Sequence, residues 1–321
     1  MVAPFPFFAV TVAGVRDLTP SMRRVTFTGV SLSDFADPGW DQRIKLVLPA
    51  AQGGYEHLPQ AGDPWDQGGL GVHAVPGRAL LDEHKPPIRT YTTRAVRAGR
   101  DGGWPEVDID MVLHDPAEGG PAARWLAGCG VGDPAVLLGP SRAWLATQPP
   151  KAARSNGVDF VPPRVTKQYL LGGDETAAPA IARILQDLPR QARGIAVVEM
   201  PRQEDEAYLP SHPGFEVRVL GRQGAAHGSL LVDAVTQAAA ELAPVGCPCE
   251  VEEIDVDAEL LWEVPRHAKG GAALVSTSLY AWLAGEAGAV RAMRRHLVSE
   301  RGIDRRSVAF MGYWRTGRAE S

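Results

Sequence analysis

The chain has 321 residues, of which 45% are hydrophobic and 22% are charged, and its formal net charge is −5. This composition is that of an ordinary globular protein, and the length favours two domains over one. The acidic balance argues against nucleic acid as a general partner, although it allows a local basic pocket. No apolar run approaches the roughly 18 residues that a transmembrane helix needs, so none is predicted.

The first ten residues are apolar, but they lack a basic start and a small-residue cleavage site. They are therefore interpreted as a strand and not as a signal peptide. Three cysteines are too few for a disulfide framework, and Cys247 and Cys249 are too closely spaced for a CxxC redox or zinc motif. The eight histidines are scattered along the chain. We expect a reduced, cytoplasmic setting and no structural metal.

Short β-rich segments, separated by Pro and Gly, fill the first half of the chain. We expect strands at Phe7–Val12, Met22–Thr28, Ile44–Leu48, Arg89–Arg94, Val107–Leu113 and Ala135–Leu138. Residues 50–87 are rich in Gly, Pro and Asp and predict a long loop, and a short helix is expected at Pro121–Leu126. Many short strands predict an antiparallel barrel or sandwich.

Residues 146–167 are polar, basic and Pro-rich and are interpreted as a linker. After them, predicted strands alternate with predicted helices, which indicates a parallel sheet. The strands are expected at Gln168–Leu171, Gly194–Met200, Glu216–Leu220, Leu279–Ala284 and Val308–Trp314, and the helices at Thr176–Leu188, Leu230–Leu242 and Gly288–Arg301. Residues 244–275 are interpreted as an excursion from this domain.

Residues 89–94, with the sequence Arg-Thr-Tyr-Thr-Thr-Arg, suit a flat, anionic cofactor. Successive side chains of a strand alternate between faces, so Arg89, Tyr91 and Thr93 are expected on one face. A guanidinium can pair with a phosphate, a phenol ring can pack on a ring system, and hydroxyls can bind a heteroatom edge. From these residues alone, an edge strand with solvated charges is the alternative.

Residues 170–177, with the sequence Leu-Leu-Gly-Gly-Asp-Glu-Thr-Ala, lead from a predicted strand into a predicted helix. Such a turn lies at the carboxyl edge of a parallel sheet, where open α/β folds bind nucleotides. The glycines allow close approach of a ligand, and the helix N-terminus offers N–H groups to a phosphate. Asp174, Glu175 and Thr176 could equally cap and charge the helix start.

A third segment joins the predicted strand that ends near His114 to the Gly-Gly-Pro-Ala-Ala-Arg-Trp run at residues 119–125. This strand, turn and helix start provide a second candidate anion site. One such site in each half of the chain suits a flavin dinucleotide and a nicotinamide dinucleotide that meet between two domains. For His114 by itself, a structural role is favoured over a catalytic one.

Four ordered motifs resemble those of the siderophore-interacting protein family, which comprises flavin-dependent ferric-siderophore reductases in the ferredoxin-reductase-like superfamily. They are Arg-x-Tyr-Thr-x-Arg, Gly-Pro-Ala-x-x-Trp, Gly-Asp-Glu-Thr-Ala-x-Pro-Ala-Ile and a C-terminal motif from Trp282 to Arg315. The resemblance extends from Met22 to Trp314. It implies a six-stranded antiparallel FAD-binding β-barrel in residues 1–145 and a parallel-sheet α/β domain that binds a nicotinamide nucleotide in residues 168–321.

The resemblance also implies site residues. Arg89 would hold the FAD pyrophosphate, Tyr91 would pack on the flavin, and Thr92 would approach its redox-active edge. The other expected FAD-binding residues are Thr93, Asp110, His114, Pro121, Ala122 and Ala123. The expected NAD(P)H-binding residues are Gly173, Asp174, Glu175, Thr176, Ala177, Gly285, Glu286 and Trp314; Trp314 could alternatively lie over the flavin or be buried in the last strand. Because the flavin carries the chemistry, no catalytic residue is assigned.

Lys45, Arg142 and Arg315 match positions where the family tends to be basic. Ferric siderophores are often anionic, so these three residues are expected to bind the substrate. The chain departs from the family pattern at Asp115, where Gly is common, and at the turn Pro140-Ser141-Arg142.

The expected function is therefore that of a cytoplasmic FAD-dependent NAD(P)H ferric-siderophore reductase that releases Fe(II), with a monomer favoured. Two other functions stay open: a reductase of the same fold that serves a protein electron carrier such as a ferredoxin, and a non-catalytic flavin- or siderophore-binding protein. The donor is also open, because Arg202 could hold the 2′-phosphate of NADPH whereas Glu199 could accept from the 2′-hydroxyl of NADH.

Overall fold

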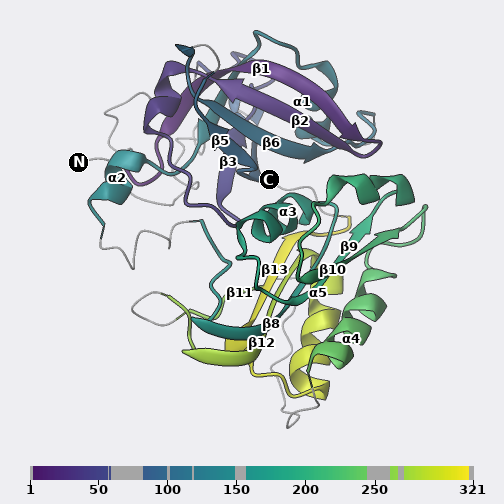
Figure 1. Ribbon diagram of the computed structural model, residues 1–321. Helices are drawn as coiled ribbons and strands as arrows, with labels where there is room; N and C mark the ends of the chain where they lie inside the picture. Colours follow the sequence, from purple (N-terminus) through teal and green to yellow (C-terminus); the bar gives the residue numbers. More distant parts are fainter. Residues whose placement is uncertain are drawn as a thin grey trace.

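The computed structural model describes residues 3–56, 58, 82–99, 102–117, 119–148, 157–243, 261–266 and 271–317. It contains two sheets, one from each half of the chain, that lie one above the other in Figure 1. Helix α3 (Ala178–Asp187) lies between them. No helix in these described ranges is both long enough and apolar enough to span a membrane.

The N-terminal sheet has seven strands, all antiparallel, in the order β4-β3-β7-β1-β2-β6-β5. They are β1 (Phe7–Thr19), β2 (Met22–Thr28), β3 (Arg43–Val47), β4 (Ile88–Thr92), β5 (Ala95–Arg97), β6 (Glu106–Val112) and β7 (Pro134–Leu138). The chain passes directly from β4, at one end of this order, to β5 at the other. The N–H of Arg94 in this passage donates to the carbonyl of Asp108 at 2.9 Å, so the two ends of the sheet meet.

Alternating burial along these strands builds the first core. On β2, Val25 and Phe27 are buried whereas the residues between and beside them are half-buried. Helix α1 (Pro121–Gly128) covers this core, and its Trp125 stacks on Phe27 with ring centroids 6.2 Å apart. Shorter helices are η1 (Val30–Asp34), η3 (Asp82–His84) and α2 (Arg142–Ala146).

The C-terminal sheet has the order β10-β9-β8-β12-β13-β11, and only β11 is antiparallel to its neighbour. The strands are β8 (Val165–Asp174), β9 (Gly194–Met200), β10 (Phe215–Gly221), β11 (Trp262–Glu263), β12 (Ser276–Glu286) and β13 (Val308–Trp314). The chain builds outward from β8 to β10 and then returns to place β12 on the other side of β8. The carboxyl ends of β8 and β12 therefore form a topological switch point, where open α/β sheets bind ligands.

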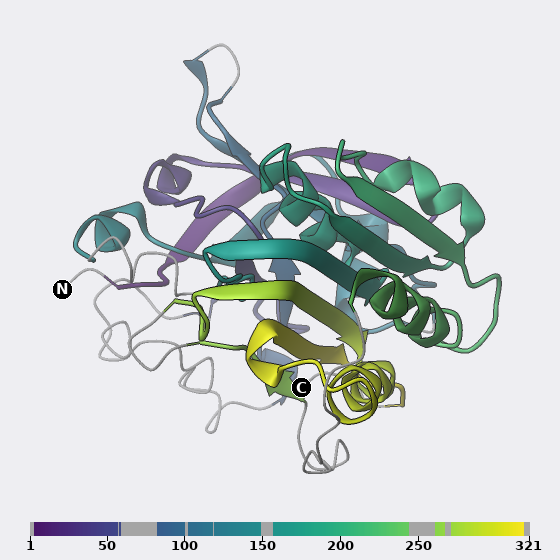
Figure 2. The same ribbon diagram turned by 60° about the horizontal axis from the view of Figure 1, so that its bottom comes forward.

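Helices cover both faces of this sheet, as expected for a parallel sheet. Helix α3 covers the face that looks toward the N-terminal sheet. Helices α4 (Leu231–Leu242) and α5 (Ala287–Arg294) pack together on the opposite face, as Figure 2 shows. Helix α5 continues as a π-helical segment at Arg295–Glu300. Two short helices, η5 (Gln203–Tyr208) and η7 (Arg305–Ser307), complete the domain.

Buried carboxylates join the two halves of the molecule. Asp41, just before β3, accepts hydrogen bonds from the backbone N–H groups of Asp159 and Phe160 at 3.0 and 2.9 Å. Asp205 on η5 accepts from the hydroxyl of Thr19 at 2.6 Å and from the N–H of Ser21 at 3.0 Å, in the turn between β1 and β2. The relative position of the two sheets is thus held by directional contacts as well as by apolar packing.

The expected fold class, an antiparallel N-terminal domain followed by a parallel-sheet α/β domain, is confirmed. Several details differ. The N-terminal sheet has a seventh strand, β5, which is too short to show a pattern, and β4 ends at Thr92 instead of Arg94. Within the expected linker, residues 158–160 dock on the N-terminal half, and residues 149–156 lie outside the described residues. Most of the 244–275 excursion, including Cys247 and Cys249, also lies outside them.

Candidate functional site

Arg89 and the start of α1 converge in the N-terminal half. The Nη2 atom of Arg89 lies 3.8 Å from the place that a Cβ on Gly120 would occupy. Gly120 is the N-cap of α1, and Pro121 stands in its first turn, next to Ala122 and Ala123. A guanidinium beside the N-terminus of a helix, where the helix dipole is positive, provides two kinds of positive group that bind a pyrophosphate.

The other residues of the motif continue from β4 into the turn after it. Arg89 and Tyr91 pair with Leu46 and Ile44 of β3 and therefore share one face of the sheet. Thr93 lies beyond the strand end, so strand alternation does not set its direction. It is buried, its N–H donates to the carbonyl of Gln42 at 2.9 Å, and its hydroxyl has no hydrogen-bond partner within the described ranges.

Asp110, an expected FAD ligand, uses its carboxylate within the protein. Nε and Nη2 of Arg24 donate to it at 2.7 and 2.8 Å, and the hydroxyl of Tyr208 donates at 2.8 Å. Tyr208 belongs to η5 of the other half, and burial raises the pKa of its hydroxyl well above 10. The side chain of Asp110 thus joins β6 to the C-terminal half.

The glycines before Asp174 are required by close packing at the switch point. A Cβ on Gly173 would stand 2.5 Å from the Cβ of Ala177 and 2.7 Å from the carbonyl oxygen of Ala284 on β12. A Cβ on Gly172 would stand 2.7 Å from Leu283. The chain can therefore turn tightly from β8 toward α3, whose first residue is Ala178, with Ala177 as its N-cap.

Asp174 is buried at the end of β8 and accepts four hydrogen bonds. The N–H and the hydroxyl of Thr176 donate to Oδ1 at 2.9 and 2.5 Å. The N–H of Glu286 and the indole Nε1 of Trp314 both donate to Oδ2 at 2.8 Å. Burial, followed by the neighbouring charge of Glu175, raises the pKa of Asp174 to about 6.

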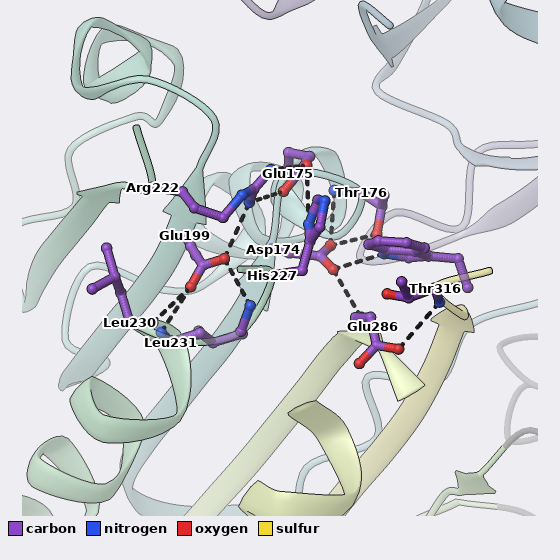
Figure 3. Close-up of polar contacts among 12 residues, drawn as sticks. Asp174, Glu175, Thr176, Glu199, Arg222, His227, Leu230, Leu231, Glu286 and Thr316 are labelled. Atoms are coloured by element: carbon purple, nitrogen blue, oxygen red, sulfur yellow. Dashed lines mark hydrogen bonds and ion pairs between the residues drawn. The ribbon is translucent and has the colours of Figure 1, made fainter. Parts of the chain in front are cut away.

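Glu175 and Glu199 are bridged by one guanidinium, as Figure 3 shows. Nη2 and Nη1 of Arg222 contact Glu175 at 2.8 and 3.0 Å, and Nη1 contacts Glu199 at 3.1 Å. Glu199 also accepts from the N–H groups of Gly228, Leu230 and Leu231, at distances of 2.9 to 3.0 Å, and so caps the start of α4. With its oxygens fully used, Glu199 has no capacity to receive a ribose hydroxyl.

Gly285 and Glu286 end β12 and lie beside Asp174. Gly285 has φ +144°, and a Cβ there would stand 2.6 Å from Oδ2 of Asp174. The carboxylate of Glu286 accepts from the N–H of Ala289 at 3.0 Å as the N-cap of α5 and from the N–H of Thr316 at 3.3 Å. Glu286 therefore holds both a helix start and the chain beyond β13.

His114 brings the two candidate sites to one seam. Burial lowers its pKa, and the charges that act on it next are those of Glu175, His227 and Arg222 from the C-terminal half. His227 lies edge-on to the indole of Trp314, with ring centroids 4.7 Å apart, and its Nδ1 is 3.7 Å from Glu175. The strand end that carries His114 thus faces the switch point.

Comparison with known families decides the assignment. Residues 11–144 match the model of the siderophore-interacting FAD-binding domain, and residues 166–317 match the model of the siderophore-interacting protein. Together these matches span most of the chain. The chain belongs to the siderophore-interacting protein family.

Members of this family match along nearly their full length. The uncharacterized protein Rv2895c of Mycobacterium tuberculosis is 31% identical, over 98% of this chain and 92% of its own. The ferric vibriobactin reductase ViuB of Vibrio cholerae is 29% identical, over 94% of this chain and 87% of its own. The crystal structure of a siderophore utilization protein from T. fusca is 28% identical and superposes with a TM-score of 0.65, covering 100% of this chain and 97% of that chain. The two-domain fold is ferredoxin-reductase-like.

The FAD-binding assignment of the siderophore-interacting protein agrees with the geometry of its N-terminal half. Arg89 beside Gly120 suits a pyrophosphate, and the buried hydroxyl of Thr93, which has no partner among the described residues, is a polar atom that a ligand could engage. Tyr91 is half-buried and packs against the N-terminal core. The residues present therefore fit FAD.

The three basic residues expected at the substrate lie on three different elements. Nζ of Lys45 on β3 donates to the hydroxyl of Thr90 at 2.5 Å, and Arg142 donates to the carbonyl of Phe35 at 3.2 Å from the start of α2. Arg315 follows β13. Helix α2 stands apart from the end of β13 in both ribbon views, so the structure does not bring Arg142 and Arg315 together.

Arg222 and His227 belong to the site, although the sequence analysis did not select them. Both follow the carboxyl end of a parallel strand, β10, and that position is the signal that could have identified them. Arg202, the candidate for a 2′-phosphate, is exposed and precedes three acidic residues in the first turn of η5. Its surroundings give it no advantage in binding an anion.

Proposed function

We propose that this siderophore-interacting protein is an FAD-dependent reductase that takes electrons from NADH or NADPH and delivers them to the iron of a ferric siderophore, which leaves as Fe(II). The observation that carries the proposal is the meeting of two nucleotide-type sites at one seam. Arg89 lies beside the start of α1 in the N-terminal half, and Asp174 lies at the ends of β8 and β12 in the C-terminal half. His114 lies next to Gly119, just before α1, and is within electrostatic reach of Glu175 beside Asp174.

In this proposal Arg89 and the first turn of α1 would hold the pyrophosphate of FAD, and Tyr91, Thr92 and Thr93 would contact its ring. When bound, FAD supplies the exchange between a two-electron donor and a one-electron acceptor. The protein contributes position, because the two halves fix the relative placement of the donor and the ring system. That placement is set by Asp41, Asp205 and the Asp110–Tyr208 contact.

The chain's own residues would also define the donor pocket. Gly172, Gly173 and Gly285 let the carboxyl ends of β8 and β12 pack closely on their neighbours. In this proposal the nucleotide would bind over the sheet edge that these ends form. Arg222 forms an ion pair with Glu175 and offsets its negative charge. The repulsion between Glu175 and a phosphate of the nucleotide is therefore weakened. Lys45 and Arg315 are proposed to attract an anionic chelate, with Arg142 as a more distant contributor.

The similarity to ViuB supports a ferric siderophore as the acceptor. We likewise propose a cytoplasmic setting, a monomeric state, and domain limits at residues 145 and 168. The donor is either NADH or NADPH. Iron enters and leaves as part of the substrate, so the proposal assigns no metal ligand to the protein.

An anaerobic absorbance titration tests the function directly. The purified protein, loaded with FAD, is titrated with NADH and separately with NADPH, and then mixed with a ferric catecholate or hydroxamate and an Fe(II) trap. Bleaching by one donor, followed by recovery as trapped Fe(II) appears, is the expected result. Bleaching without recovery would redirect the proposal to another acceptor, such as a protein electron carrier. Binding of FAD without bleaching by either donor would favour a non-catalytic binding protein.

A further inference from the structure

Strand β10 forms one edge of the C-terminal sheet. It stands at one end of the strand order, and β9 is its only strand partner among the described residues. An edge strand with unpaired N–H and C=O groups can pair with a strand of another chain, and folded proteins commonly prevent this with Pro or with a bulge. The sequence Phe-Glu-Val-Arg-Val-Leu-Gly at residues 215–221 has no Pro, and its register with β9 is unbroken.

The backbone groups of every second residue of β10 point away from β9. The N–H of Gly194 on β9 donates to the carbonyl of Gly214 at 3.0 Å, just before β10 begins. In a parallel pair, one residue directs both of its backbone groups to the neighbouring strand and the next residue directs both away from it. Phe215, Val217 and Val219 therefore direct their N–H and C=O groups to the outer side of the sheet.

Two of these six outward groups are occupied within the chain. The N–H of Phe215 donates to the carbonyl of His212 at 3.1 Å. The carbonyl of Val219 accepts from the side chain of Gln203 at 3.4 Å. Within the part of the chain that the structure describes, no hydrogen bond is formed by the carbonyl of Phe215, by either group of Val217 or by the N–H of Val219. The middle of the edge thus offers two donors and two acceptors to another strand.

The side chains of β10 differ between its two faces. On the face toward α3, the half-buried Phe215, Val217 and Val219 line a groove of about 370 Å³ together with residues that follow η5, among them Leu209. The opposite face, toward α4, is charged.

On the charged face, Arg218 pairs with Glu216 at 2.8 Å and with Glu241 of α4 at 2.6 Å. Glu216 is 61% exposed, so its carboxylate remains accessible to a further cation. An acidic and a basic residue therefore stand two positions apart on one face of an edge strand.

This charge pattern is complementary to itself. If two copies of β10 pair antiparallel about Val217, Glu216 of each copy lies directly opposite Arg218 of the other. Pairing about Glu216 or about Arg218 would instead place two like charges opposite each other, which is destabilising. The charges therefore favour a single register for the pairing of two copies.

The same register joins the backbone groups that lack partners. The two Val217 residues would exchange two hydrogen bonds, and the N–H of Val219 in each copy would donate to the carbonyl of Phe215 in the other. The outward groups that would not be needed are those already bonded within the chain. On the other face, Phe215 of each copy would lie opposite Val219 of the other, beside the groove.

We propose that the outer edge of β10 is a pairing surface for a second copy of this chain, joined by antiparallel strands centred on Val217. The contact uses the same patch on both copies and therefore closes as a two-fold symmetric dimer. One pair of short strands is expected to bury less than the roughly 1,200 Å² of a stable interface, so the association is weak. The monomer of the proposed function is then the dilute form, and the dimer forms as the concentration rises.

Sedimentation velocity of the full chain as purified, from about 10 µM to about 1 mM, tests the surface. The wild type is expected to pass from monomer to dimer as the concentration rises. Glu216→Arg leaves two cations at the contact, and Arg218→Glu leaves two anions. Because like charges would then lie opposite each other, each variant alone is expected to raise the dimer dissociation constant by about tenfold or more.

An equimolar mixture of these two variants is the sharpest measurement. One chain then presents only cations and the other only anions, so a mixed dimer is expected although neither variant pairs with itself. Arg306→Glu, which changes an exposed arginine just before β13, is the matched control and should leave the wild-type association unchanged. Thermal unfolding of each variant shows that its fold is preserved.

A second variant tests the backbone contact. Val217→Pro removes an N–H that points away from β9, so the sheet keeps its internal hydrogen bonds while the central bonds of the dimer are lost. The dimer dissociation constant is again expected to rise by about tenfold or more.

Three results would overturn the proposal. A wild type that stays monomeric up to about 1 mM would leave the edge to an extended segment of a different protein. A dimer that neither charge variant weakens would be formed through another surface. Failure of the mixture to pair, when both single variants have lost the dimer, would exclude the register centred on Val217. No measurement here uses FAD, a nucleotide or iron, so the pairing surface and the proposed function stand or fall separately.

Discussion

The indole N–H of Trp282 donates to the carboxylate of Asp41 at 3.0 Å, across the seam between the two halves of the molecule. Trp282 is fully buried in the centre of the C-terminal sheet, whereas Asp41 precedes β3 of the N-terminal sheet. Because the same carboxylate accepts from Asp159 and Phe160, donors from the connecting segment and from the second half converge on one group of the first. The angle between the two candidate cofactor sites depends on this contact.

Asp41→Ala is expected to lower the free energy of unfolding by about 3 kcal/mol at pH 7, because three buried donors lose their acceptor. Urea unfolding followed by circular dichroism measures the change. Asp17→Ala removes an exposed ion pair with Arg23 and serves as the control, with an expected effect below about 1 kcal/mol. Equal effects of the two substitutions would show that the Asp41 contact does not hold the seam.

The stability contributed by Asp41 is expected to depend on pH. Burial, then the charge of Asp159, raises its pKa from 3.8 to about 6. The folded protein therefore keeps this proton to higher pH than the unfolded chain does, and the resulting stabilisation is present below pH 4 and is lost as the pH rises through 6. A change of this size corresponds to roughly 3 kcal/mol. Asp41→Asn cannot titrate, so its stability relative to the wild type should rise between pH 4 and pH 7; a difference that is flat with pH would contradict the assignment.

Arg89→Ala is expected to weaken FAD binding by about 30-fold or more, since it removes charge-assisted hydrogen bonds to the pyrophosphate. The measurement is the ratio of flavin to protein after purification, followed by FAD titration of the apoprotein. Arg89→Lys keeps the charge but not the forked geometry and should retain part of the affinity. Arg16→Ala, at an exposed position on β1, is the control. Wild-type flavin content in Arg89→Ala would refute the proposed FAD site.

Gly285→Ala should destabilise the protein by about 3 kcal/mol. The backbone there has φ +144°, and a Cβ would stand 2.6 Å from Asp174, so both conformational strain and a steric clash arise. Gly128→Ala at the end of α1 meets no atom within 4 Å and is expected to change the free energy of unfolding by at most about 1 kcal/mol. Thermal unfolding compares the two, and a tolerated Gly285→Ala would show that the ends of β8 and β12 can move apart freely.

Tyr208→Phe removes one hydroxyl at the second interdomain contact. Asp110 keeps its two bonds from Arg24 but loses the one from η5, so a loss of about 1–2 kcal/mol is expected. Denaturant unfolding measures this value. The absence of any loss would mean that Arg24 and the nearby guanidinium of Arg94 satisfy Asp110 without Tyr208.

Periodicity and motif order predicted the fold class and the family, because both are expressed locally. The apolar run that forms β9 and the Gly-Gly pair at the end of β8 can be recognised from a few consecutive residues. Trp262–Glu263 forms a strand of two residues, too short for any period, and its existence depends on pairing with Met311 and Phe310. Sequence alone gives no signal for such an edge strand.

The partners of the site carboxylates could not be predicted. Asp110 and Asp174 stand in motifs that suggest ligand contact, yet each is occupied by a side chain from a distant part of the chain, Tyr208 or Trp314. Which donor satisfies a buried acceptor is decided by tertiary packing and not by local pattern. The strand bulge at Tyr313, which directs Trp314, also becomes visible only when β13 is paired with β12.

The capping of α4 by Glu199 bears on protein engineering. For the proposed nicotinamide donor, an acidic residue near the end of the second strand of such a sheet is the position expected to bind the ribose 2′-hydroxyl. In this chain Glu199→Arg would leave three N–H groups of a helix start without their acceptor and place a second cation beside Arg222. Conversion by that route would therefore unfold the region before it altered coenzyme choice, and a redesign has to begin from exposed positions such as Arg202.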